Sequence, residues 1–580
     1  MNNSIDVLVI GSGAAGMLAA ITAAQNGQST VLLTKGQAGR CGATATIVGG
    51  CSVDGNTCVE LLGLKANSND SAELFFNDMM AGGKYINNPK LVESIVTEIG
   101  PIIQWLRING LNIGNPTPSA GHAYSRGVVT PGMEILQTLK KFLISFGVKV
   151  REEFFATELL LNDGIVSGVA GIDMRSGKIT AIQANSIILA TGGGMRIYPH
   201  QTAPEELTGD GHAMAIRAGA KLIDMEMIQF LPCTLITPRM WSGIQFPWIL
   251  GPQSGIRAWL LNRYGERFMA KWDPINMEMA TRDIISIACT KEILENRGGP
   301  NGGVFMSWAH LPSNIIDFAA DWYFNQTSEL RAGGGQISGN WQWEGFDFSQ
   351  LVADIKNGNA IEVSSASHFF MGGLLIDEFC ATSIPGLFAC GEVAGGAHGA
   401  NRLGGNATSQ ILVQGKIAGN TASKYAKSNS NVGITATAWK DSSQKIKMPI
   451  VKESGISPFE IKQELQNIAN INVSMLRSGP ELKSALSSIQ KLRSDILPFV
   501  YTKSKDRIYN KEWTEAIECH NMTDTLEAII LSASKRDESR GAHYREDFPQ
   551  QNELAVNGIT KQLNGIMCYE SISCPTKYPK

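Results

Sequence analysis

The stretch that decides the fold is DVLVIGSGAAG, at residues 6–16. Apart from Asp6, residues 6–10 are apolar and mostly β-branched, which is typical of a buried β-strand, and residues 17–26 have the composition of a helix. A strand, a G-x-G-x-x-G turn and a helix, in this order, form the context in which the motif binds a dinucleotide. The sequence therefore predicts a Rossmann-like unit at the beginning of the chain.

Each small residue of the motif has an expected task in holding the cofactor. Gly11 permits the tight turn, Gly13 lets a pyrophosphate approach the backbone, and Gly16 allows close packing of helix and strand. Ala14 and Ala15 begin the helix, whose free N–H groups and positive dipole end favour phosphate. We expect all five residues to contact the cofactor. A glycine turn without a ligand is the alternative, and the complete strand–turn–helix context disfavours it.

The kind of dinucleotide follows from the rest of the chain. A second strand is expected at residues 30–33, but it ends in Thr34 and Lys35 and not in the acidic residue that would hold a ribose hydroxyl. Two further strands run into glycine turns, at residues 186–194 and 385–392. Three separated turns of this kind indicate a large ligand buried along its length, as FAD would be.

Composition excludes several classes of protein. Glycine accounts for 61 of 580 residues, which is above the usual ~7% and has no collagen period. A net charge of −3 gives no electrostatic basis for binding nucleic acid. None of the ten cysteines forms a C-x-x-C pair, which argues against a disulfide scaffold, a zinc ribbon or a bound iron–sulfur cluster. We predict no metal site, and reduced thiols in the cytoplasm.

One segment resembles a signal peptide or a membrane span. Residues 5–24 carry a single charge, Asp6, but no basic residues precede them and glycines interrupt them. No other apolar run reaches ~18 residues. We therefore expect no direct membrane span and a cytoplasmic location. The alternative is peripheral attachment to the inner face of the membrane through a partner protein.

Several longer motifs are shared with one family. SHFFMGG at 367–373, IPGLFACGE at 384–392 and HGANRLGGN at 398–406 strongly resemble the fumarate reductase and succinate dehydrogenase flavoprotein family, which includes L-aspartate oxidase and adenylylsulfate reductase. Further matches are TGDG at 208–211, MEMIQF at 225–230, GERFM at 265–269, RD at 282–283 and ESRGAH at 538–543. The resemblance covers the chain to about residue 550.

The resemblance implies an α/β architecture. A Rossmann-like FAD-binding domain is expected from residues 1–235 and 356–432, with an α+β capping domain inserted at 236–355. A C-terminal helical domain is expected at 433–550, followed by a tail at 551–580.

The residues themselves support the boundary of the helical domain. The Ser-, Thr- and Lys-rich stretch 429–447 is typical of a linker, and residues 458–492 are rich in helix formers at helical spacing. Residues 550–580 show no clear periodicity, and we predict no regular structure there.

The resemblance also assigns catalytic roles. Family members transfer hydride between flavin N5 and a carbon next to a carboxylate, and an arginine moves the proton at the neighbouring carbon; here that arginine is Arg282. His368 and Arg402 match the residues that bind one substrate carboxylate, for which a guanidinium fork is well suited. The alternative for Arg282 is a surface ion pair with Asp283 or Glu266.

The family match adds further contacts to FAD. These are Thr34, Lys35, Gly42, Ala43, Thr191, Gly192, Asp210, Gly391, Glu392, Arg402 and Asn406. Gly42 stands where succinate dehydrogenases carry the histidine that bonds covalently to FAD, and no histidine occurs before His122. We therefore predict a non-covalent FAD, which favours reduction or an easily oxidised substrate.

Two more departures concern the substrate. The family's Gln-Phe-His-Pro reads QFLP at 229–232, so Leu231 replaces a histidine that helps bind the second carboxylate and leaves an apolar wall. The family's Thr-Glu-Gly aligns with LGP at 250–252, without the glutamate, although the insertion at 241–248 leaves this register open. We predict a substrate that keeps one acid group and has a bulkier or less charged second end.

The chain must also exchange electrons with another molecule. It has neither a C-x-x-C-H haem motif nor cluster cysteines, and Cys568 and Cys574 are isolated. We expect a separate iron–sulfur subunit; O₂ or a small molecule is the alternative. The main hypothesis is the catalytic flavoprotein subunit of a fumarate-reductase-like complex. The alternatives are an L-aspartate oxidase, an adenylylsulfate-reductase-like flavoprotein, and a flavin subunit for electron transfer without its own substrate site.

Overall fold

The main sheet carries the first predicted strands. A computed structural model describes residues 5–47, 50–119, 121–237, 239–244, 249–250, 256–318, 349–429 and 432–574. The sheet has the order β6-β2-β1-β9-β8-β7, and β18 also pairs with β9. Its strands are β1 (Ile5–Ile10), β2 (Thr30–Leu33), β6 (Lys149–Arg151), β7 (Phe154–Asn162), β8 (Ile165–Asp173), β9 (Lys178–Leu189) and β18 (Leu387–Ala389).

The parallel part of this sheet is the Rossmann-like unit. β6, β2, β1, β9 and β18 are parallel, whereas β7 and β8 extend the sheet antiparallel. On one side α1 (Ala14–Gln25) packs against α12 (Asn406–Ser428). A Cβ on Gly415 or Gly419 of α12 would lie 2.5 Å from a carbonyl oxygen of α1, so glycine permits this close approach.

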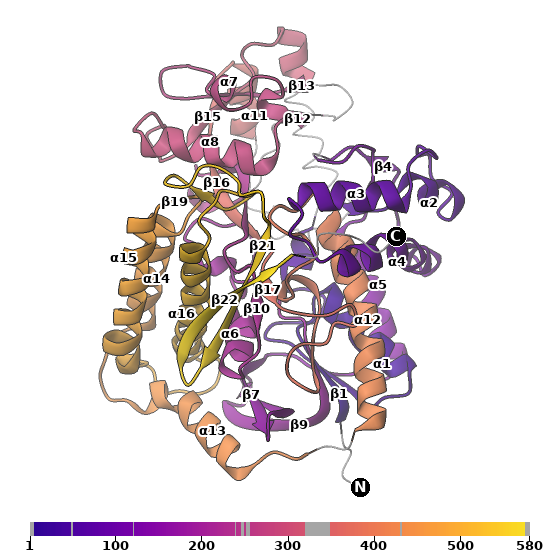
Figure 1. Ribbon diagram of the computed structural model, residues 1–580, viewed down its shortest axis with the longest axis vertical. Helices are drawn as coiled ribbons and strands as arrows, with labels where there is room; N and C mark the ends of the chain where they lie inside the picture. The colour runs from indigo at the N-terminus through magenta and orange to yellow at the C-terminus, as the bar shows by residue number, and fades with distance from the viewer. Residues whose placement is uncertain are drawn as a thin grey trace.

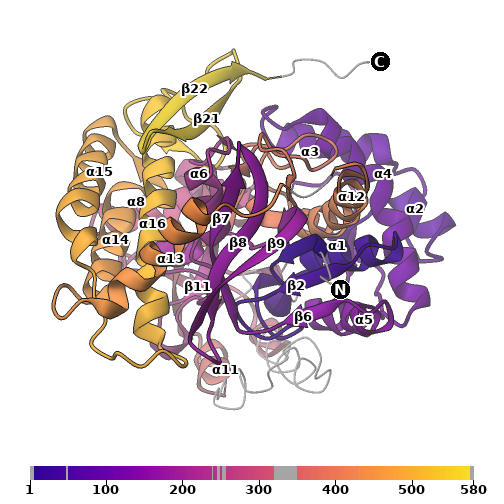
Figure 2. The same ribbon diagram turned by 90° about the horizontal axis from the view of Figure 1, so that it is seen from below.

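The remaining elements of the first 235 residues surround this unit. The helices are α2 (Gly55–Glu60), α3 (Ala72–Gly82), α4 (Pro89–Ile108), α5 (Gly132–Ser145) and α6 (Asp210–Arg217). A small sheet consists of β3 (Gly50–Ser52), β4 (Pro116–Thr117) and β5 (Gly127–Val129). Figure 2 shows the main sheet between α1, α5 and α12 on one side and α13 to α16 on the other.

A second body lies at the top of Figure 1. Its antiparallel sheet has the order β11-β16-β15-β14 and a separate core that includes Leu260, Ile285 and Val363. The strands are β11 (Ile228–Leu235), β14 (Trp259–Leu261), β15 (Val304–Ser307) and β16 (Ile361–Phe370), and the helices are α7 (Met269–Trp272), α8 (Arg282–Leu294) and α11 (Ser349–Lys356). This body contains the described part of the segment predicted to form a cap.

The C-terminal helices are partly as predicted. α14 (Pro458–Asn472) and α15 (Gly479–Lys491) occupy the stretch expected to be helical, and α16 (Lys511–Lys535) packs against both. The expectation of a linker at 429–447 is wrong over most of its length, because α13 (Ala436–Val451) begins within it. The Thr435 hydroxyl caps this helix, and Ile446 and Ile450 are buried beside Trp513. The polar residues that resemble a linker instead form the solvent face.

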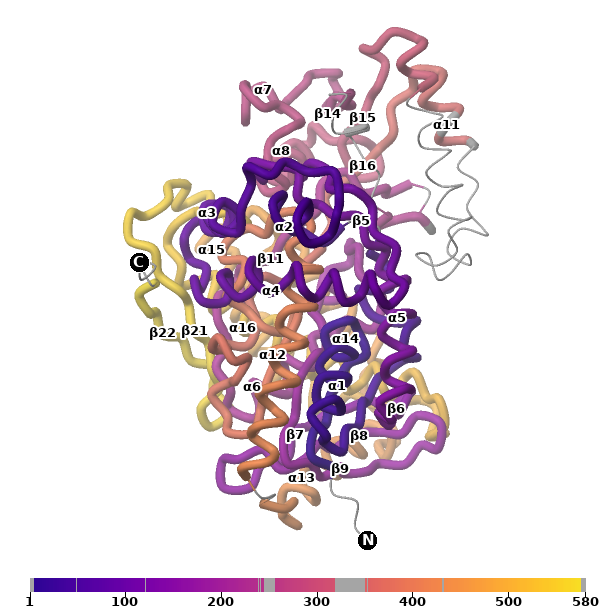
Figure 3. The backbone as a smooth tube through the Cα atoms, turned by 90° about the vertical axis from the view of Figure 1, so that its right-hand side faces the viewer, coloured from indigo at the N-terminus to yellow at the C-terminus, as the bar shows by residue number. Residues whose placement is uncertain are grey.

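The tail is also corrected by the structure. Residues 550–580 were expected to lack regular structure, but β21 (Val556–Leu563) and β22 (Ile566–Ser573) form a hairpin. Its turn is Asn564-Gly565, both with positive φ, which is a strong hairpin signal when apolar residues flank it. The hairpin joins β10 (Leu222–Ile223) and β17 (Gly373–Leu374) in one sheet and lies beside α16 (Figure 3).

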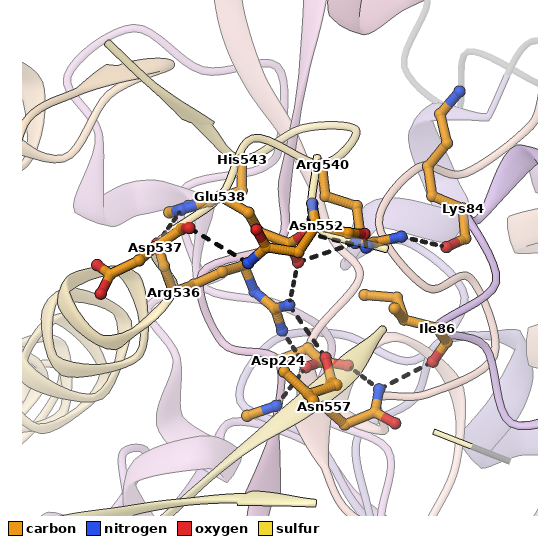
Figure 4. Close-up of polar contacts among 12 residues, drawn as sticks. Lys84, Ile86, Asp224, Arg536, Asp537, Glu538, Arg540, His543, Asn552 and Asn557 are labelled. Atoms are coloured by element: carbon orange, nitrogen blue, oxygen red, sulfur yellow. Dashed lines mark hydrogen bonds and ion pairs between the residues drawn. The ribbon is translucent and has the colours of Figure 1, made fainter. Parts of the chain in front are cut away.

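Buried ion pairs and hydrogen bonds join the segment after α16, and the hairpin, to residues 224–226 (Figure 4). Arg536 pairs with Asp224 at 3.0 Å and Glu538 at 2.9 Å, and with Glu226. Asn557 of β21 donates to Asp224 Oδ2 at 2.6 Å. The ESRGAH motif at 538–543 therefore has a structural role here. No helix in the described ranges is both long and apolar enough to cross a membrane.

Candidate active site

The first glycine turn is built for close backbone approach. Gly11 has φ +111°, and a Cβ there would lie 2.2 Å from the carbonyl oxygen of Ala190. A Cβ on Gly16 would lie 1.9 Å from the carbonyl oxygen of Gly11, so the contact of α1 with the turn requires glycine. Gly13 precedes α1 and has no side chain to cap the helix, and of the first N–H groups that of Ala14 donates to Thr44 Oγ1 at 3.1 Å. The free N–H groups at this end are those that a pyrophosphate would take.

Lys35 and Asp210, both predicted to contact FAD, lie together and pair with each other. The Lys35 ammonium lies 2.9 Å from Asp210 Oδ2 and 2.8 Å from Glu518 Oε1, and it donates to Thr208 Oγ1 at 3.1 Å. Burial opposes the charge of Lys35, but Asp210 and Glu518 outweigh burial and raise its pKa. Glu518 comes from α16, and the sequence offered no signal for it. The Lys35 ammonium is therefore paired within the protein.

Three more of the predicted cofactor residues lie just after parallel strands or at the beginning of a helix. Thr191 follows β9, Glu392 follows β18, and Asn406 begins α12. Thr191 Oγ1 and Asn406 Oδ1 are buried and have no hydrogen-bond partner among the described residues. Burial raises the pKa of Glu392 to about 7, although its carboxylate accepts a hydrogen bond from the Phe370 N–H at 2.9 Å. Buried polar atoms without partners indicate a polar ligand, and a dinucleotide fits them.

Glycines complete this part of the cradle. Gly192 and Gly391 have φ of +75° and +77° and form the turns after β9 and β18, and the Gly391 N–H donates to Gln414 Oε1 at 3.0 Å. Gly42 has φ +80° and precedes Ala43, and within the described chain no atom lies within 4 Å of a Cβ built on Gly42. Gly42 therefore borders open space. Thr34 lies across from the first turn, where its hydroxyl accepts from Ser12 at 2.8 Å.

Three separate elements bring the predicted catalytic residues together. Arg282 is the first residue of α8, His368 lies on β16, and Arg402 lies in the loop before α12. The guanidinium of Arg402 stacks 4.6 Å above the ring of Phe369, the residue after His368. A Cβ on Gly404 would lie 3.9 Å from Arg282 Nη2, so Arg282 lies against the loop that carries Arg402.

A β-bulge sets the direction of His368. Gln229 of β11 pairs with Phe369 and the next residue, Phe230, pairs with Ser367, so His368 is the extra residue of β16. The same Gln229 holds Arg402 from two sides: its Oε1 accepts from Arg402 Nε at 3.1 Å, and its Nε2 donates to the Arg402 carbonyl at 2.8 Å. Bulges are common beside active sites because they redirect a side chain.

The site carries unbalanced positive charge. Burial lowers the pKa of Arg282 to about 10, and burial with the nearby Arg282 lowers that of Arg402 to about 9. Burial and both arginines hold the pKa of His368 well below its usual value, so its imidazole is neutral at pH 7. Arg282 Nη1 is buried without a hydrogen-bond partner in the described part of the chain. This arrangement favours an anion.

The alternative pairing of Arg282 is not observed among the described residues. Asp283 accepts instead from Asn401 Nδ2 at 3.3 Å, and Glu266 accepts from Asn262 Nδ2 at 2.9 Å and lies 3.6 Å from Lys271. In the described ranges no group of three or more His, Cys, Asp or Glu side chains is arranged to hold a metal ion.

Comparison with known proteins identifies the family. Residues 6–408 match the model of an FAD binding domain, and residues 462–562 match that of the fumarate reductase flavoprotein C-terminal region. One chain of the fumarate reductase (CoM/CoB) of Methanothermobacter marburgensis is 35% identical over 555 residues, which cover 94% of each sequence. The chain belongs to the fumarate reductase and succinate dehydrogenase flavoprotein family. It is a flavin-dependent oxidoreductase with FAD as its cofactor, as predicted.

Solved structures of this flavoprotein family match the whole chain. Mycobacterium smegmatis Sdh1 in complex with UQ1 has a TM-score of 0.85 at 30% identity, over 100% of this chain and 95% of that chain. Escherichia coli quinol fumarate reductase FrdA has a TM-score of 0.84 at 25% identity, over 100% and 98%. Archaeoglobus fulgidus adenylylsulfate reductase has a TM-score of 0.76 at 19% identity, over 98% and 96%, and shares the fold alone. The predicted fold class is confirmed.

The departures from the family pattern also have positions in this flavoprotein. Leu231 is 1% exposed on β11, two residues after Gln229, and strand alternation places both side chains on one face. His200 does not replace the lost histidine, because its two ring nitrogens bond the hydroxyls of Ser242 and Thr234, each at 2.9 Å. Leu250 ends the strand β12 (Ile249–Leu250), whereas residues 251–252 lie outside the described residues, so the missing glutamate stays a prediction.

Proposed function

We propose that this flavoprotein is the catalytic subunit of a complex related to fumarate reductase and succinate dehydrogenase, and that its substrate is a carboxylated alkene or alkane other than plain fumarate or succinate. FAD, when bound, supplies the hydride donor or acceptor. The proposal rests on the buried positive charge of Arg282 and Arg402, which lie with His368 in one site. Among the described residues, Arg282 Nη1 has no hydrogen-bond partner there. A substrate carboxylate would pair with this charge and supply hydrogen-bond acceptors for both guanidinium groups.

The three side chains have different expected tasks. Gln229 accepts the hydrogen bond from Arg402 Nε–H. The two terminal Nη groups of Arg402 are then available to bind a carboxylate as a fork. The imidazole of His368 adds a second donor to the same carboxylate. Arg282 moves a proton at the carbon next to the one that exchanges hydride. Burial lowers its pKa to about 10, which makes a guanidinium a more effective acid.

The second end of the substrate is inferred from Leu231. This buried side chain offers no donor where a second carboxylate would need one, and an unpaired carboxylate against an apolar wall costs several kcal/mol, roughly. An alkyl or aryl group there would gain from apolar contact. The M. marburgensis relative is named a fumarate reductase, so fumarate is the reference compound for any test.

A substrate screen tests this proposal. The FAD-loaded protein is reduced with dithionite without oxygen and mixed with crotonate, cinnamate or fumarate, while flavin absorbance reports reoxidation. We expect crotonate or cinnamate to reoxidise the flavin faster than fumarate, and Leu231→His to reverse the order. Turnover of fumarate by the wild-type protein at rates typical of fumarate reductases would contradict the substrate assignment.

The assembly around the site belongs to the same proposal. We infer a non-covalent FAD, because Gly42 offers no side chain for a bond to the flavin. We infer that a separate iron–sulfur subunit provides the route for electrons, and the names of the relatives, which describe subunits of larger enzymes, support this. The proposed division of the chain is an FAD-binding domain at 1–235 and 356–432, a cap at 236–355 and a helical domain at 433–550.

A further inference from the structure

His368 has a hydrogen-bond partner that sequence motifs do not indicate. Its Nδ1 lies 2.8 Å from the hydroxyl oxygen of Thr202. Thr202 belongs to a short segment that runs beside β16: the Ser367 N–H donates to the His200 carbonyl at 3.1 Å, and the Thr202 N–H donates to the Ser367 carbonyl at 3.0 Å. Backbone bonds on both sides of residue 201 therefore fix the position of the Thr202 hydroxyl.

The direction of the hydrogen bond decides what His368 can bind. A neutral imidazole carries one proton, on Nδ1 or on Nε2. If the Thr202 hydroxyl donates to Nδ1, the proton is on Nε2, and His368 presents an N–H donor. If Nδ1 donates to Thr202, Nε2 is a bare acceptor, which repels a carboxylate because a carboxylate only accepts.

The surroundings of Thr202 favour the first direction. Among the described residues, the other acceptor near its hydroxyl is the Ser367 carbonyl at 3.5 Å, at the limit of a hydrogen bond, and this carbonyl already accepts the Thr202 N–H. The Thr202 hydroxyl therefore donates its hydrogen bond to Nδ1 of His368, which leaves the ring proton on Nε2. Burial, and then Arg402 and Arg282, lower the pKa of His368 and so disfavour a second proton on the ring, which means that the imidazole does not donate from both nitrogens at pH 7.

We propose that Thr202 is a positioning residue that holds His368 as its Nε2–H tautomer and so makes it a donor to the substrate carboxylate. This inference rests on the proposed function, because it assigns a direction to one bond of that site. Thr202 acts through His368 and need not touch the substrate. The β-bulge sets the direction of the ring, and the hydrogen bond from Thr202 determines which ring nitrogen carries the proton.

The tautomer is measured without turnover. The FAD-loaded protein is labelled with ¹⁵N-histidine, and the His368 resonances are assigned by their loss in His368→Gln. We expect an Nε2–H pattern in the wild type and in Thr202→Ser, and a mixture of tautomers in Thr202→Val. A wild-type His368 with its proton on Nδ1 would overturn the proposal without any Thr202 variant, so the test does not depend on how well a variant folds.

Kinetics give the second readout, with crotonate as the probe. We expect Thr202→Val to raise KM about tenfold with a smaller change in kcat, and Thr202→Ser to restore the wild-type value. Thr234→Val is the matched control, because it removes a hydroxyl from His200, which the site does not use. Equal damage in the Ser and Val variants would assign Thr202 a packing role and overturn the proposal. Failure of every carboxylated alkene with the wild type would refute the proposed function, while the tautomer measurement would still stand.

Discussion

Lys35 and Arg282 are two cations in the interior of one flavoprotein, and their surroundings differ. Lys35, at the cofactor end, has carboxylates at 2.9 and 2.8 Å, which raise its pKa. Arg282, at the substrate end, has a terminal nitrogen without a partner in the described chain, and burial lowers its pKa. The cation at the cofactor end is therefore paired within the protein, whereas the substrate end keeps a guanidinium nitrogen without a partner among the described residues until an anion enters. Mutations can test this difference.

The largest effect is expected for Arg282→Gln. Loss of a proton-transfer group lowers turnover of the best carboxylated substrate by about 10²–10⁴-fold. The melting temperature should rise, because the substitution removes a buried charge that no described carboxylate compensates. Both are measured on FAD-loaded protein, by flavin reoxidation and by thermal unfolding. The control is Lys291→Gln, a change on the same helix that breaks surface ion pairs with Glu295 and Glu546. It should change turnover and melting temperature little. A clear fall in melting temperature would show that Arg282 is compensated after all.

For Lys35→Gln at the cofactor end, we expect the melting temperature to fall, in contrast to Arg282→Gln. This change removes the cation that lies against both Asp210 and Glu518, and breaking a buried ion pair from one side costs about 3–5 kcal/mol of stability. We expect a lower melting temperature and partial loss of FAD, both recovered in part at acidic pH as the carboxylates protonate. Lys416→Gln, which removes an exposed pair with Glu98, provides the matched comparison. If Lys35→Gln and Lys416→Gln have the same melting temperature, the proposed difference between the cofactor end and the substrate end is wrong.

The first glycine turn gives a smaller effect, of steric origin. Gly11→Ala places a Cβ 2.2 Å from the Ala190 carbonyl oxygen at a φ of +111°. The collision should cost about 1–3 kcal/mol and weaken FAD binding, measured as FAD content after gel filtration. Gly27→Ala is the control: its φ is also positive, at +80°, but in the described chain nothing lies within 4 Å of the new Cβ. Equal FAD loss in both variants would mean that backbone strain, and not contact with Ala190, is the cause.

The cofactor end was more predictable than the substrate end for a physical reason. The first glycine turn is local, since eleven consecutive residues encode a strand, a turn and a helix start. The hairpin turn at Asn564-Gly565 is local too, and attention to that dipeptide would have predicted it. Contacts such as Thr202 with His368, or Gln229 with Arg402, join residues 166 and 173 positions apart. No spacing rule indicates them, because the tertiary fold alone brings these residues together.

Family motifs predict which residues are catalytic but not the electrostatic state of those residues. The matches named Arg282, His368 and Arg402, and the structure brings all three together. Asp283 follows Arg282 in the sequence, but its carboxylate accepts a hydrogen bond from Asn401 instead. For this reason no described carboxylate bonds to Arg282. A sequence shows which charges are neighbours along the chain, whereas compensation depends on neighbours in space.

The smallest effect is expected at Glu392, which belongs to the cofactor end but is influenced by Arg402 of the substrate end. Burial raises its folded-state pKa to about 7, above its unfolded value near 4.5. The folded protein thus binds this proton more tightly, so the contribution of Glu392 to stability falls as pH rises from about 4.5 to 7. We expect the melting temperature of the wild type, minus that of Glu392→Gln, to decrease over this range.

Glu378 gives the opposite sign and serves as the control. Lys90 lowers its pKa, so its stabilising contribution is present above pH 4.5 and disappears only in acid. The difference between wild type and Glu378→Gln should therefore be flat between pH 5 and 8. A flat profile for Glu392 as well would mean that Arg402 stabilises the carboxylate fully. The charge of the substrate end would then already be compensated from the cofactor end, and the two ends would form one balanced network.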